Sequence, residues 1–395
     1  MLTARDVQGK IITIPENIPK ERVVEWQTNH YYCPCCTAEL ILKAGQIKIP
    51  HFAHKKTSAC TASSEPESEY HLLGKLKLFQ WFVNNHIETE MEPYLPEIRK
   101  RPDILIYYKE QSYAIEFQCS PISEEVFLSR TKSYQEAGIK PIWILAEKRI
   151  KRKKTRQYSL SAFQWLFAMN TVHSPMIFTF RPDEQKLYML EPLTPFSPRT
   201  TFSQLAVLPL SNTLPQILFS TNKTWKFHFI EEWRAQRKSW AIHSVKTAKQ
   251  SNPFFNGLYQ NGLSPAWIPS EIGLPVEGMV MIETSAVEWQ GWIFMDCLQN
   301  KEIGSRVYCS QIYHSFQRRI TNGQIRLRTL PMISVKNPFL AVDAYLILLV
   351  KLEILEFGGK GIYLIKNKLN PPTSSIEYVQ LESSIYSKLS EMILL

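Results

Sequence analysis

The sequence lacks the features that mark exported and membrane-spanning proteins. Residues 1–6 run straight into polar residues, and no export signal is visible. The longest apolar run, Phe339 to Phe357, contains four charged residues, whereas a membrane-spanning helix needs about 20 residues with few or no charges. We therefore expect a cytoplasmic protein with no membrane partner, and a buried or amphipathic helix over this run.

Disulfides are also not expected. The chain has seven cysteines, an odd number, and four of them precede residue 61. In a chain without an export signal, clustered cysteines indicate metal binding before disulfide formation. No internal repeat is visible, and 395 residues leave room for two or three domains.

Acidic residues are fewer than basic ones, 36 against 46, for a formal net charge of +10. This balance favours an anionic partner, with nucleic acid first among them. The sharpest basic run is KRIKRKKTR, with seven basic residues in nine from Lys148 to Arg156. Lys151, Arg152, Lys153 and Lys154 are its candidate DNA contacts. The alternative is a solvated linker between domains.

The first motif is Cys33-x-x-Cys36, a tight turn on which two thiolates can bind one Zn²⁺. His51 follows Cys36 after 14 intervening residues, a separation typical of two-part zinc sites. His51, His54 and Cys60 compete for the two remaining positions. We favour Cys33, Cys36, His54 and Cys60, with His51 as the substitute, in a structural site. The alternative is a set of reduced, buried cysteines.

A second motif predicts a β-hairpin. Two apolar runs, 104–108 and 113–118, flank a polar break at residues 109–112. If Tyr108 lies opposite Tyr113, then Asp103 lies opposite Gln118, with Glu116 close by. Paired carboxylates suit Mg²⁺ or Mn²⁺, which take oxygen ligands, water and substrate phosphate. The alternative is structural, with Asp103 capping a strand and Glu116 paired to an arginine.

Helices are expected on both sides of the hairpin, at 67–84 and 124–137, followed by a strand at 142–145. The second helix makes a β-α-β crossover, so strands 113–118 and 142–145 should be parallel. Glu67, His71 and Lys75 share one face of the first helix. That face either forms solvated salt bridges or brings these groups to the open end of the hairpin.

The expected fold is α/β (α+β) in three parts. Residues 1–62 form a small β module with zinc, and residues 63–157 form a compact α-β-β-α-β core. Residues 158–395 form a mainly helical domain for binding DNA or a partner. In this last part, residues 225–249 interleave tryptophans with basic residues. That pattern suits stacking on single-stranded nucleic acid, although such tryptophans more often belong to a core.

Several spaced motifs resemble the competence protein CoiA family. Over residues 1–150 they are Cys33-Pro34-x-Cys36, His51-Phe52-Ala53-His54-Lys55, Glu67-Ser68-x-x-His71-x-x-x-Lys75, Arg101-Pro102-Asp103, Ala114-Ile115-Glu116-Phe117-Gln118, Arg130-Thr131-Lys132-x-Tyr134 and Pro141-Ile142-Trp143-Ile144-Leu145. The resemblance implies a PD-(D/E)XK nuclease-like domain, with a core like that of restriction endonucleases, and a zinc-finger-like N-terminal module. It also implies a cytoplasmic role in natural transformation, in which incoming single-stranded DNA is recombined into the chromosome.

The resemblance also implies roles for individual residues. Asp103 and Glu116 become metal ligands, and Gln118 stands where the wider superfamily has a lysine. A glutamine can orient water but cannot carry positive charge toward the scissile phosphate. Lys75 or His71 could supply what Gln118 lacks. Further assignments from the matching motifs are Glu67 as a third carboxylate, directly or through water, and Arg101, Arg130 and Lys132 as DNA contacts.

Three functions follow from these observations. The first is a Mg²⁺- or Mn²⁺-dependent DNA nuclease acting in recombination of DNA that has been taken up. The second is a non-catalytic factor on a nuclease scaffold that binds DNA or assists a recombinase. The third is an adaptor that binds recombination proteins. Resemblance of fold alone does not separate them.

Overall fold

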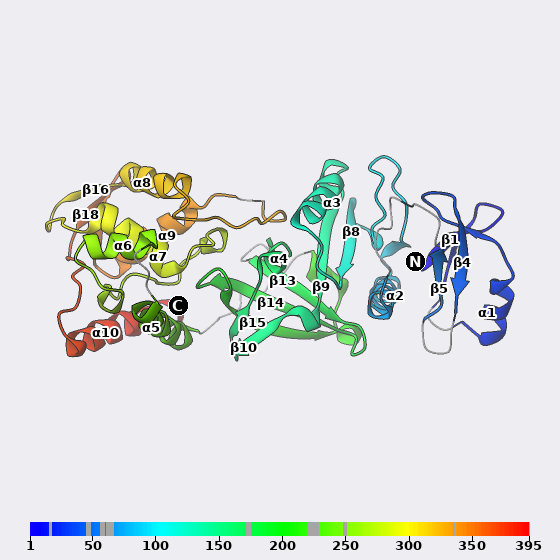
Figure 1. Ribbon diagram of the computed structural model, residues 1–395, viewed down its shortest axis with the longest axis horizontal. Coiled ribbons are helices and arrows are strands. Elements are labelled where there is room, and N and C mark those ends of the chain that lie inside the picture. Colours follow the sequence, from blue (N-terminus) through cyan, green and yellow to red (C-terminus); the bar gives the residue numbers. More distant parts are fainter. Residues whose placement is uncertain are drawn as a thin grey trace. The chain divides into compact units, whose positions relative to one another are not determined.

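The structure, a computed structural model, describes residues 1–15, 18–44, 49–55, 60, 67–170, 175–219, 229–247, 251–334 and 336–394. The chain forms two compact units, each built from three segments. Figure 1 labels the helices and strands and colours them along the sequence. Unit 1 comprises Met1–Ile150, Leu166–Leu190 and Leu205–Asn222. Unit 2 comprises Lys151–Trp165, Glu191–Gln204 and Lys223–Leu395.

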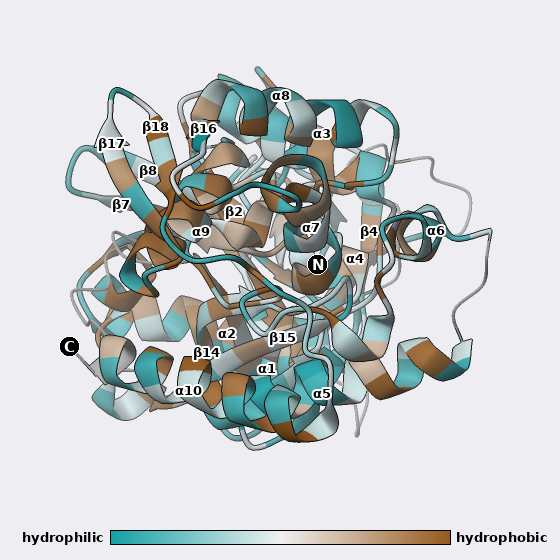
Figure 2. Cartoon of the chain, turned by 90° about the vertical axis from the view of Figure 1, so that its left-hand side faces the viewer, coloured by the Kyte–Doolittle hydropathy of each residue, from teal (hydrophilic) through white to brown (hydrophobic). Residues whose placement is uncertain are grey.

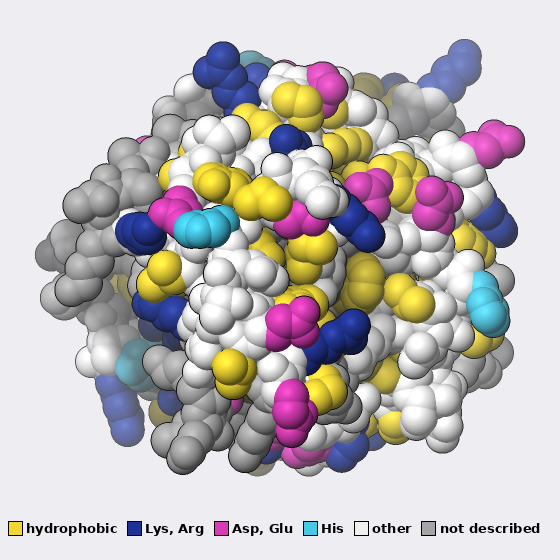
Figure 3. Space-filling view, turned by 90° about the vertical axis from the view of Figure 1, so that its right-hand side faces the viewer, with side chains coloured by type: hydrophobic (Ala, Val, Ile, Leu, Met, Phe, Trp, Pro, Cys, Tyr) yellow, Lys and Arg dark blue, Asp and Glu magenta, His cyan; other side chains and the backbone are white. Residues whose placement is uncertain are grey.

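The N-terminal module, residues 1 to 60 of unit 1, is a small antiparallel sheet in the order β2-β1-β3-β4-β5. Its elements are β1 (Thr3–Arg5), β2 (Ile11–Thr13), α1 (Lys20–Gln27), β3 (Tyr31–Tyr32), β4 (Glu39–Lys43) and β5 (His51–His54). Tyr31, Leu40 and Phe52 make its core, together with the buried Cys33. The expected β module is therefore present. Figure 3 views it from outside, and basic, acidic and apolar side chains are interspersed over the face drawn there.

The rest of unit 1 carries the expected α-β-β-α-β core, with one further strand, β6, between the first helix and the hairpin. Its elements are α2 (Glu69–Asn84), β6 (Glu88–Met91), β7 (Ile104–Tyr108), β8 (Gln111–Gln118), α3 (Glu124–Glu136) and β9 (Lys140–Ala146). Strands β6, β7 and β8 are antiparallel, and β8 and β9 are parallel as predicted. Ser68 caps α2 and Ser123 caps α3, each accepting a backbone hydrogen bond three residues on.

The predicted hairpin register is wrong by two residues. Tyr108 pairs with Gln111, and Ile104 pairs with Ile115. The turn is shorter than the polar break, because Lys109 and Glu110 both adopt positive φ angles, 48° and 52°. Two such residues make the tight turn that matches the twist of the flanking strands. The last pair at the open end of the hairpin is Ile104 with Ile115. The next pair in this register would be Asp103 with Glu116, and not Asp103 with Gln118.

The structure holds more strands after residue 146 than the sequence predicted. The elements are η1 (Glu147–Arg149), β10 (Lys151–Lys154), β11 (Gln157–Ser159), α4 (Ala162–Trp165), β12 (Met169–Asn170), β13 (Pro175–Arg181), β14 (Lys186–Pro195), β15 (Thr200–Pro209), η2 (Leu210–Asn212) and η3 (Pro215–Leu218). In unit 1 the strands β13 and β14 extend the sheet beyond β9. In unit 2 the order is β10-β11-β15. Part of the basic run is thus an exposed strand, β10, and the division between the two units falls just before that strand.

The remainder of unit 2 is mainly helical, as expected. Its elements are α5 (Ile230–Thr247), α6 (Pro253–Gln260), η4 (Pro265–Trp267), η5 (Met279–Met281), α7 (Ala286–Ile293), the π-helical turn η6 (Phe294–Leu298), β16 (Arg306–Tyr308), α8 (Cys309–Thr321), α9 (Phe339–Lys351), β17 (Leu355–Gly359), β18 (Ile362–Ile365) and α10 (Ser375–Leu394). In Figure 2 hydrophilic residues are prominent on α5 and α8, and the ribbon around α9 is largely hydrophobic.

Two expectations for this part need correction. The helix expected over 339–357 ends at Lys351, and Glu353 has a positive φ of 64° before β17 begins. Trp233 is wholly buried and belongs to the core of unit 2, so it is not a stacking platform for nucleic acid. Trp240 packs against Phe254 and Phe255. Residues 220–228 and 248–250, which complete the tryptophan-rich segment, lie outside the described residues.

Within the described part of the chain, no helix has both the length and the apolar character needed to cross a bilayer.

Candidate functional site

The N-terminal module brings four of the predicted zinc ligands together. Cys33 and Cys36 lie on the turn between β3 and β4, where Cys35 N donates to Cys33 Sγ (3.4 Å). His54 ends β5, and Cys60 follows it. The ligand atoms of these four residues all lie within 4.8 Å of one another. The spacing motif and the fold therefore converge on one Cys₃His cluster.

The distances in this cluster fit a tetrahedral metal. Cys33 Sγ lies 4.0 Å from Cys60 Sγ, and Cys36 Sγ lies 3.4 Å from His54 Nε2. In a tetrahedron with Zn–S bonds of ~2.3 Å, neighbouring sulfurs are roughly 3.8 Å apart. His51, the substitute ligand, is elsewhere, because its Nδ1 contacts the carbonyl oxygen of Ile49 (2.9 Å). The cluster could hold a structural metal with four protein ligands.

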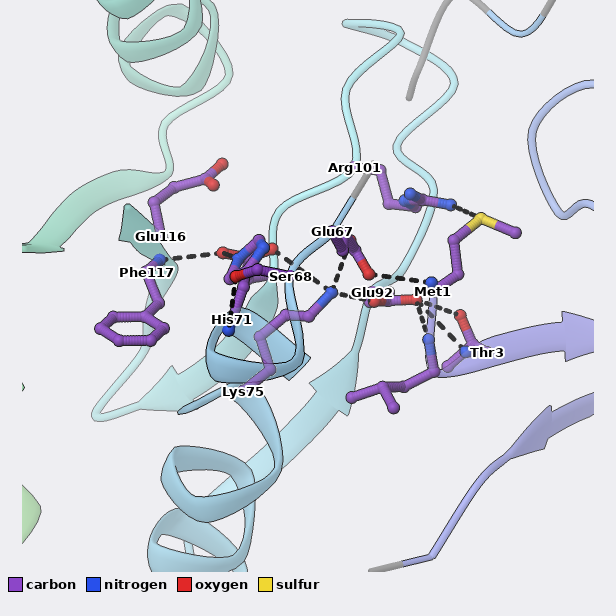
Figure 4. Close-up of polar contacts among 12 residues, drawn as sticks. Met1, Thr3, Glu67, Ser68, His71, Lys75, Glu92, Arg101, Glu116 and Phe117 are labelled. Atoms are coloured by element: carbon purple, nitrogen blue, oxygen red, sulfur yellow. Dashed lines mark hydrogen bonds and ion pairs between the residues drawn. The ribbon is translucent and has the colours of Figure 1, made fainter. Parts of the chain in front are cut away.

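A second polar cluster lies where α2 meets the hairpin. At its centre is Lys75, whose side chain is completely buried. Its ammonium group is 2.7 Å from Glu67 Oε1, forms a short contact with Glu92 Oε1, and lies 3.8 Å from Asp103 Oδ1 (Figure 4). Burial lowers the pKa of Lys75, but these three carboxylates raise it above its usual range. Lys75 therefore stays charged.

Asp103 is the point where the helix and the hairpin meet. Its Oδ2 is 3.1 Å from His71 Nε2 on α2 and accepts a hydrogen bond from the backbone N–H of Phe117 on β8 (2.8 Å). Burial raises the pKa of Asp103, but His71 and Lys75 together hold it below its usual range. Asp103 is thus an ionised carboxylate in a mostly dry setting.

Glu116 lies on β8 and is buried, with 2% of its surface exposed. Arg130 Nη2 donates to both of its oxygens (2.6 and 2.7 Å), and the Tyr134 hydroxyl donates to Oε1 (2.5 Å). Burial raises the pKa of Glu116 to about 7, although Arg130 opposes this shift. Glu116 therefore titrates near neutral pH.

Asp103 and Glu116 are the two carboxylates at the hairpin that could hold a hard divalent cation. A carboxylate has about four lone-pair sites, and Glu116 uses three of them for Arg130 and Tyr134. Asp103 Oδ1 faces Lys75 at 3.8 Å, beyond hydrogen-bond distance. Each residue thus has an oxygen to offer, and Mg²⁺ usually takes one or two carboxylates with water and substrate phosphate.

Glu67 does not complete a three-carboxylate cluster. Among the residues that the structure describes, the Cys₃His cluster is the group in which three or more metal-binding side chains approach within 4.8 Å. The oxygens of Glu67 instead face Lys75 and the α-amino group of Met1 (2.8 Å). Direct coordination by Glu67 is therefore not part of this geometry.

The other candidate residues lie around this site or apart from it. Gln118 Nε2 donates to the carbonyl oxygen of Ser120 (2.6 Å). Arg101 is turned toward the N-terminal module, where its Nη1 lies 2.5 Å from Met1 Sδ. Lys132 is exposed on α3 and pairs with Glu136 at 3.5 Å. The basic residues of β10 are exposed and belong to unit 2.

The sequence analysis gave two members of the site no role: Glu92 was missed, and Tyr134 entered only as part of a motif. Glu92 is buried and pairs with Lys75, but it follows an unremarkable strand, β6. Tyr134 binds Glu116, and it does stand four residues after Arg130 on the same helix face. The four-residue spacing of Arg130 and Tyr134 is a local signal that the sequence offers. No comparable local pattern marks Glu92 as a member of the site.

Comparison with known proteins gives a consistent result over the whole chain. Three family models match: "Competence protein CoiA, N-terminal domain" at residues 15–63, "Competence protein CoiA, nuclease-like domain" at 67–223, and "Competence protein CoiA, C-terminal domain" at 223–379. A curated relative, "Competence protein CoiA" of Bacillus subtilis (strain 168), is 30% identical over 359 residues, covering 89% of this chain and 92% of that protein. No solved structure matches the chain.

Proposed function

The chain belongs to the competence protein CoiA family, and from this premise we propose that it acts on DNA taken up in natural transformation, as a divalent-metal-dependent nuclease. The activity would belong to the cytoplasm, where the incoming strand is recombined, with recombination proteins as partners. Zn²⁺ in the Cys₃His cluster would have a structural role.

One observation supports cleavage most strongly. The hairpin pairs Ile104 with Ile115, so Asp103 and Glu116 are the next residues along the two chains, and Lys75 brings a positive charge to within 3.8 Å of Asp103. Two carboxylates and a nearby cation are the groups that metal-assisted phosphodiester hydrolysis uses. Here the cation comes from α2 instead of from the position of Gln118.

Each residue then has a defined part. Asp103 and Glu116 would hold Mg²⁺ or Mn²⁺, which acts as a Lewis acid on the phosphate when bound. Lys75 neutralises charge beside Asp103, and Gln118 would orient the attacking water. His71 keeps Asp103 oriented through its Nε2 contact. Arg130 orients Glu116 and reduces the cost of its burial.

A non-catalytic DNA-binding or recombinase-assisting factor is the second candidate. It is favoured by the contacts of Glu116, whose two oxygens are both bonded to Arg130, and of Gln118, whose amide is bonded to Ser120. A metal must compete with or share these contacts. On this alternative the cluster is a structural network that keeps the nuclease scaffold folded while DNA binds elsewhere.

Incubation of the full chain with labelled single- and double-stranded DNA, with and without Mg²⁺ or Mn²⁺, tests the proposal. Metal-dependent cleavage by the wild type should be lost in Asp103→Asn and Glu116→Gln. Glu124→Gln, which changes an exposed carboxylate on α3, is the matched control and should cut normally. DNA binding without cleavage would select the second candidate, and cleavage that survives both site variants would remove the assigned residues.

A further inference from the structure

Glu92 connects the N-terminal module to the proposed nuclease site. Its two oxygens are divided between two neighbours: Oε1 contacts the Lys75 ammonium group, and Oε2 accepts hydrogen bonds from Leu2 N (2.9 Å), Thr3 N (3.2 Å) and Thr3 Oγ1 (3.1 Å). Figure 4 shows these contacts as a continuous chain from β1 to α2. A carboxylate that accepts hydrogen bonds on both of its oxygens has little freedom to rotate.

The backbone of Glu92 is fixed as firmly as its side chain. Its N–H donates to the carbonyl oxygen of Asp103 (3.0 Å), so the two acidic residues are neighbours across β6 and β7. Glu92 also has a positive φ of 48°, in the left-handed region that a residue with a Cβ enters only at a conformational cost. Strained backbone of this kind persists where the surrounding contacts overdetermine it.

These contacts determine where the Lys75 ammonium group lies. It is bonded to Glu67 (2.7 Å) and to Glu92, and it remains 3.8 Å from Asp103 Oδ1. An ammonium group has three donors. If Glu92 were withdrawn, the nearest carboxylate left to accept the second donor would be Asp103. The oxygen that a metal would need would then be bonded to Lys75.

We infer that Glu92 is a positioning residue of the proposed metal site. Thr3 at the start of strand β1, and Leu2 just before it, hold Glu92 so that Lys75 leaves Asp103 open to a cation. This inference rests on the proposed function for its metal. It makes the N-terminal module a part of the site and not only a neighbouring zinc-binding domain.

The test compares two substitutions at one position. Glu92→Gln removes the charge and keeps the length, and Glu92→Asp keeps the charge but is too short to reach both β1 and Lys75. In titration calorimetry of the full chain, both should bind Mn²⁺ at least about tenfold more weakly than the wild type, since each loses a charge-assisted contact. Glu90→Gln, an exposed carboxylate on the same strand, is the control and should bind normally.

Thr3→Val tests the part played by β1 without changing any charge. It removes one of the three donors to Glu92 Oε2, so Mn²⁺ affinity should fall by about threefold, as expected for one modest hydrogen bond. Wild-type affinity in both Glu92→Asp and Thr3→Val would overturn the inference. Weak binding by Glu92→Gln alone would mean that only the charge matters, and would overturn it too.

A second measurement separates this inference from the proposed function. In protein with isotope-labelled lysine, the buried Lys75 ammonium group should give a signal protected from exchange with water, and Glu92→Asp should shift it and speed its exchange. If the wild type binds no Mn²⁺, the proposed metal site fails, whereas an unchanged Lys75 signal in Glu92→Asp defeats the positioning role of Glu92.

Discussion

Arg130 donates from a single nitrogen, Nη2, to both carboxylate oxygens of Glu116, at 2.6 and 2.7 Å. Its guanidinium group also lies over the ring of Trp143, 5.3 Å from the centroid. The arginine is therefore held by packing as well as by charge. A metal that binds Glu116 must share this carboxylate with a cation that has no easy alternative position.

The first prediction concerns pH. Because burial raises the pKa of Glu116 from 4.5 to about 7, protons compete with the metal below that value. Mn²⁺ affinity should rise about tenfold between pH 6 and pH 8, as the ionised fraction of such a group does. Tyr134→Phe removes a donor that lowers this pKa, so its midpoint should move to higher pH. Calorimetric titrations across this range check both, and a flat profile would contradict the assignment.

The same shift has the opposite effect on stability. Between pH 4.5 and about 7 the folded state holds a proton on Glu116 that the unfolded state has released. The contribution of Glu116 to the free energy of unfolding therefore falls as pH rises through this window. Denaturant unfolding of the wild type and of Glu116→Gln should show the difference, with the variant lacking this decline.

Lys75→Met should be strongly destabilising. It leaves the buried carboxylates of Glu67, Glu92 and Asp103 without their shared cation, and breaking a buried pair in this way costs about 3–5 kcal/mol. Lys75 lowers the pKa of Glu92 to about 2 against the effect of burial. Its stabilisation is thus present above pH 4.5 and is lost as pH falls toward 2. Urea unfolding at several pH values should show the two proteins converging in acid.

The Cys₃His cluster gives a prediction with two matched controls. Metal analysis of protein prepared without added zinc should find about one equivalent, as for a four-ligand structural site. Cys60→Ser and His54→Ala should lose it. Cys35→Ser and His51→Ala should keep it, because these two residues lie outside the Cys₃His cluster. Loss of metal in the controls instead would assign the ligands differently.

Gly74 on α2 has no room for a side chain. A Cβ added there would overlap the ring of Phe117 on β8, and Phe117 N donates to Asp103. Gly74→Ala should therefore destabilise the protein by about 1–3 kcal/mol or more through overpacking, although alanine is the better helix former. Thermal unfolding measures the effect, and a stabilised variant would show that the contact relaxes easily.

The exposed strand β10 predicts salt-dependent DNA binding. Replacing its four basic residues by glutamine should weaken binding and reduce the slope of log affinity against log salt by roughly 3 to 4, one phosphate contact for each residue. The control replaces four other exposed basic residues of unit 2: Lys238, Lys301, Arg306 and Lys351. An unchanged slope would leave β10 as a charged sheet edge that resists pairing with other chains.

The sequence predicted the parts of this site better than their assembly. Apolar periodicity and the serine caps located α2, β7, β8, α3 and β9, because those signals are local. The register failed because Lys109 and Glu110 adopt positive φ without a glycine or asparagine to indicate it. Glu92 was missed because its partners on β1 are about ninety residues away along the chain, and no local pattern encodes such a contact.

The division of the chain into interleaved segments limits how the protein can be dissected. Unit 2 takes Lys151–Trp165 and Glu191–Gln204 from within the span matched by the nuclease-like family model. A fragment that begins at residue 223 would lack both segments, and with them β10 and β11. A fragment that ends at residue 157 would lack β13 and β14, which extend the sheet of unit 1. Loss of activity in such a truncated protein would therefore indicate misfolding, and would not locate the function in the missing segment.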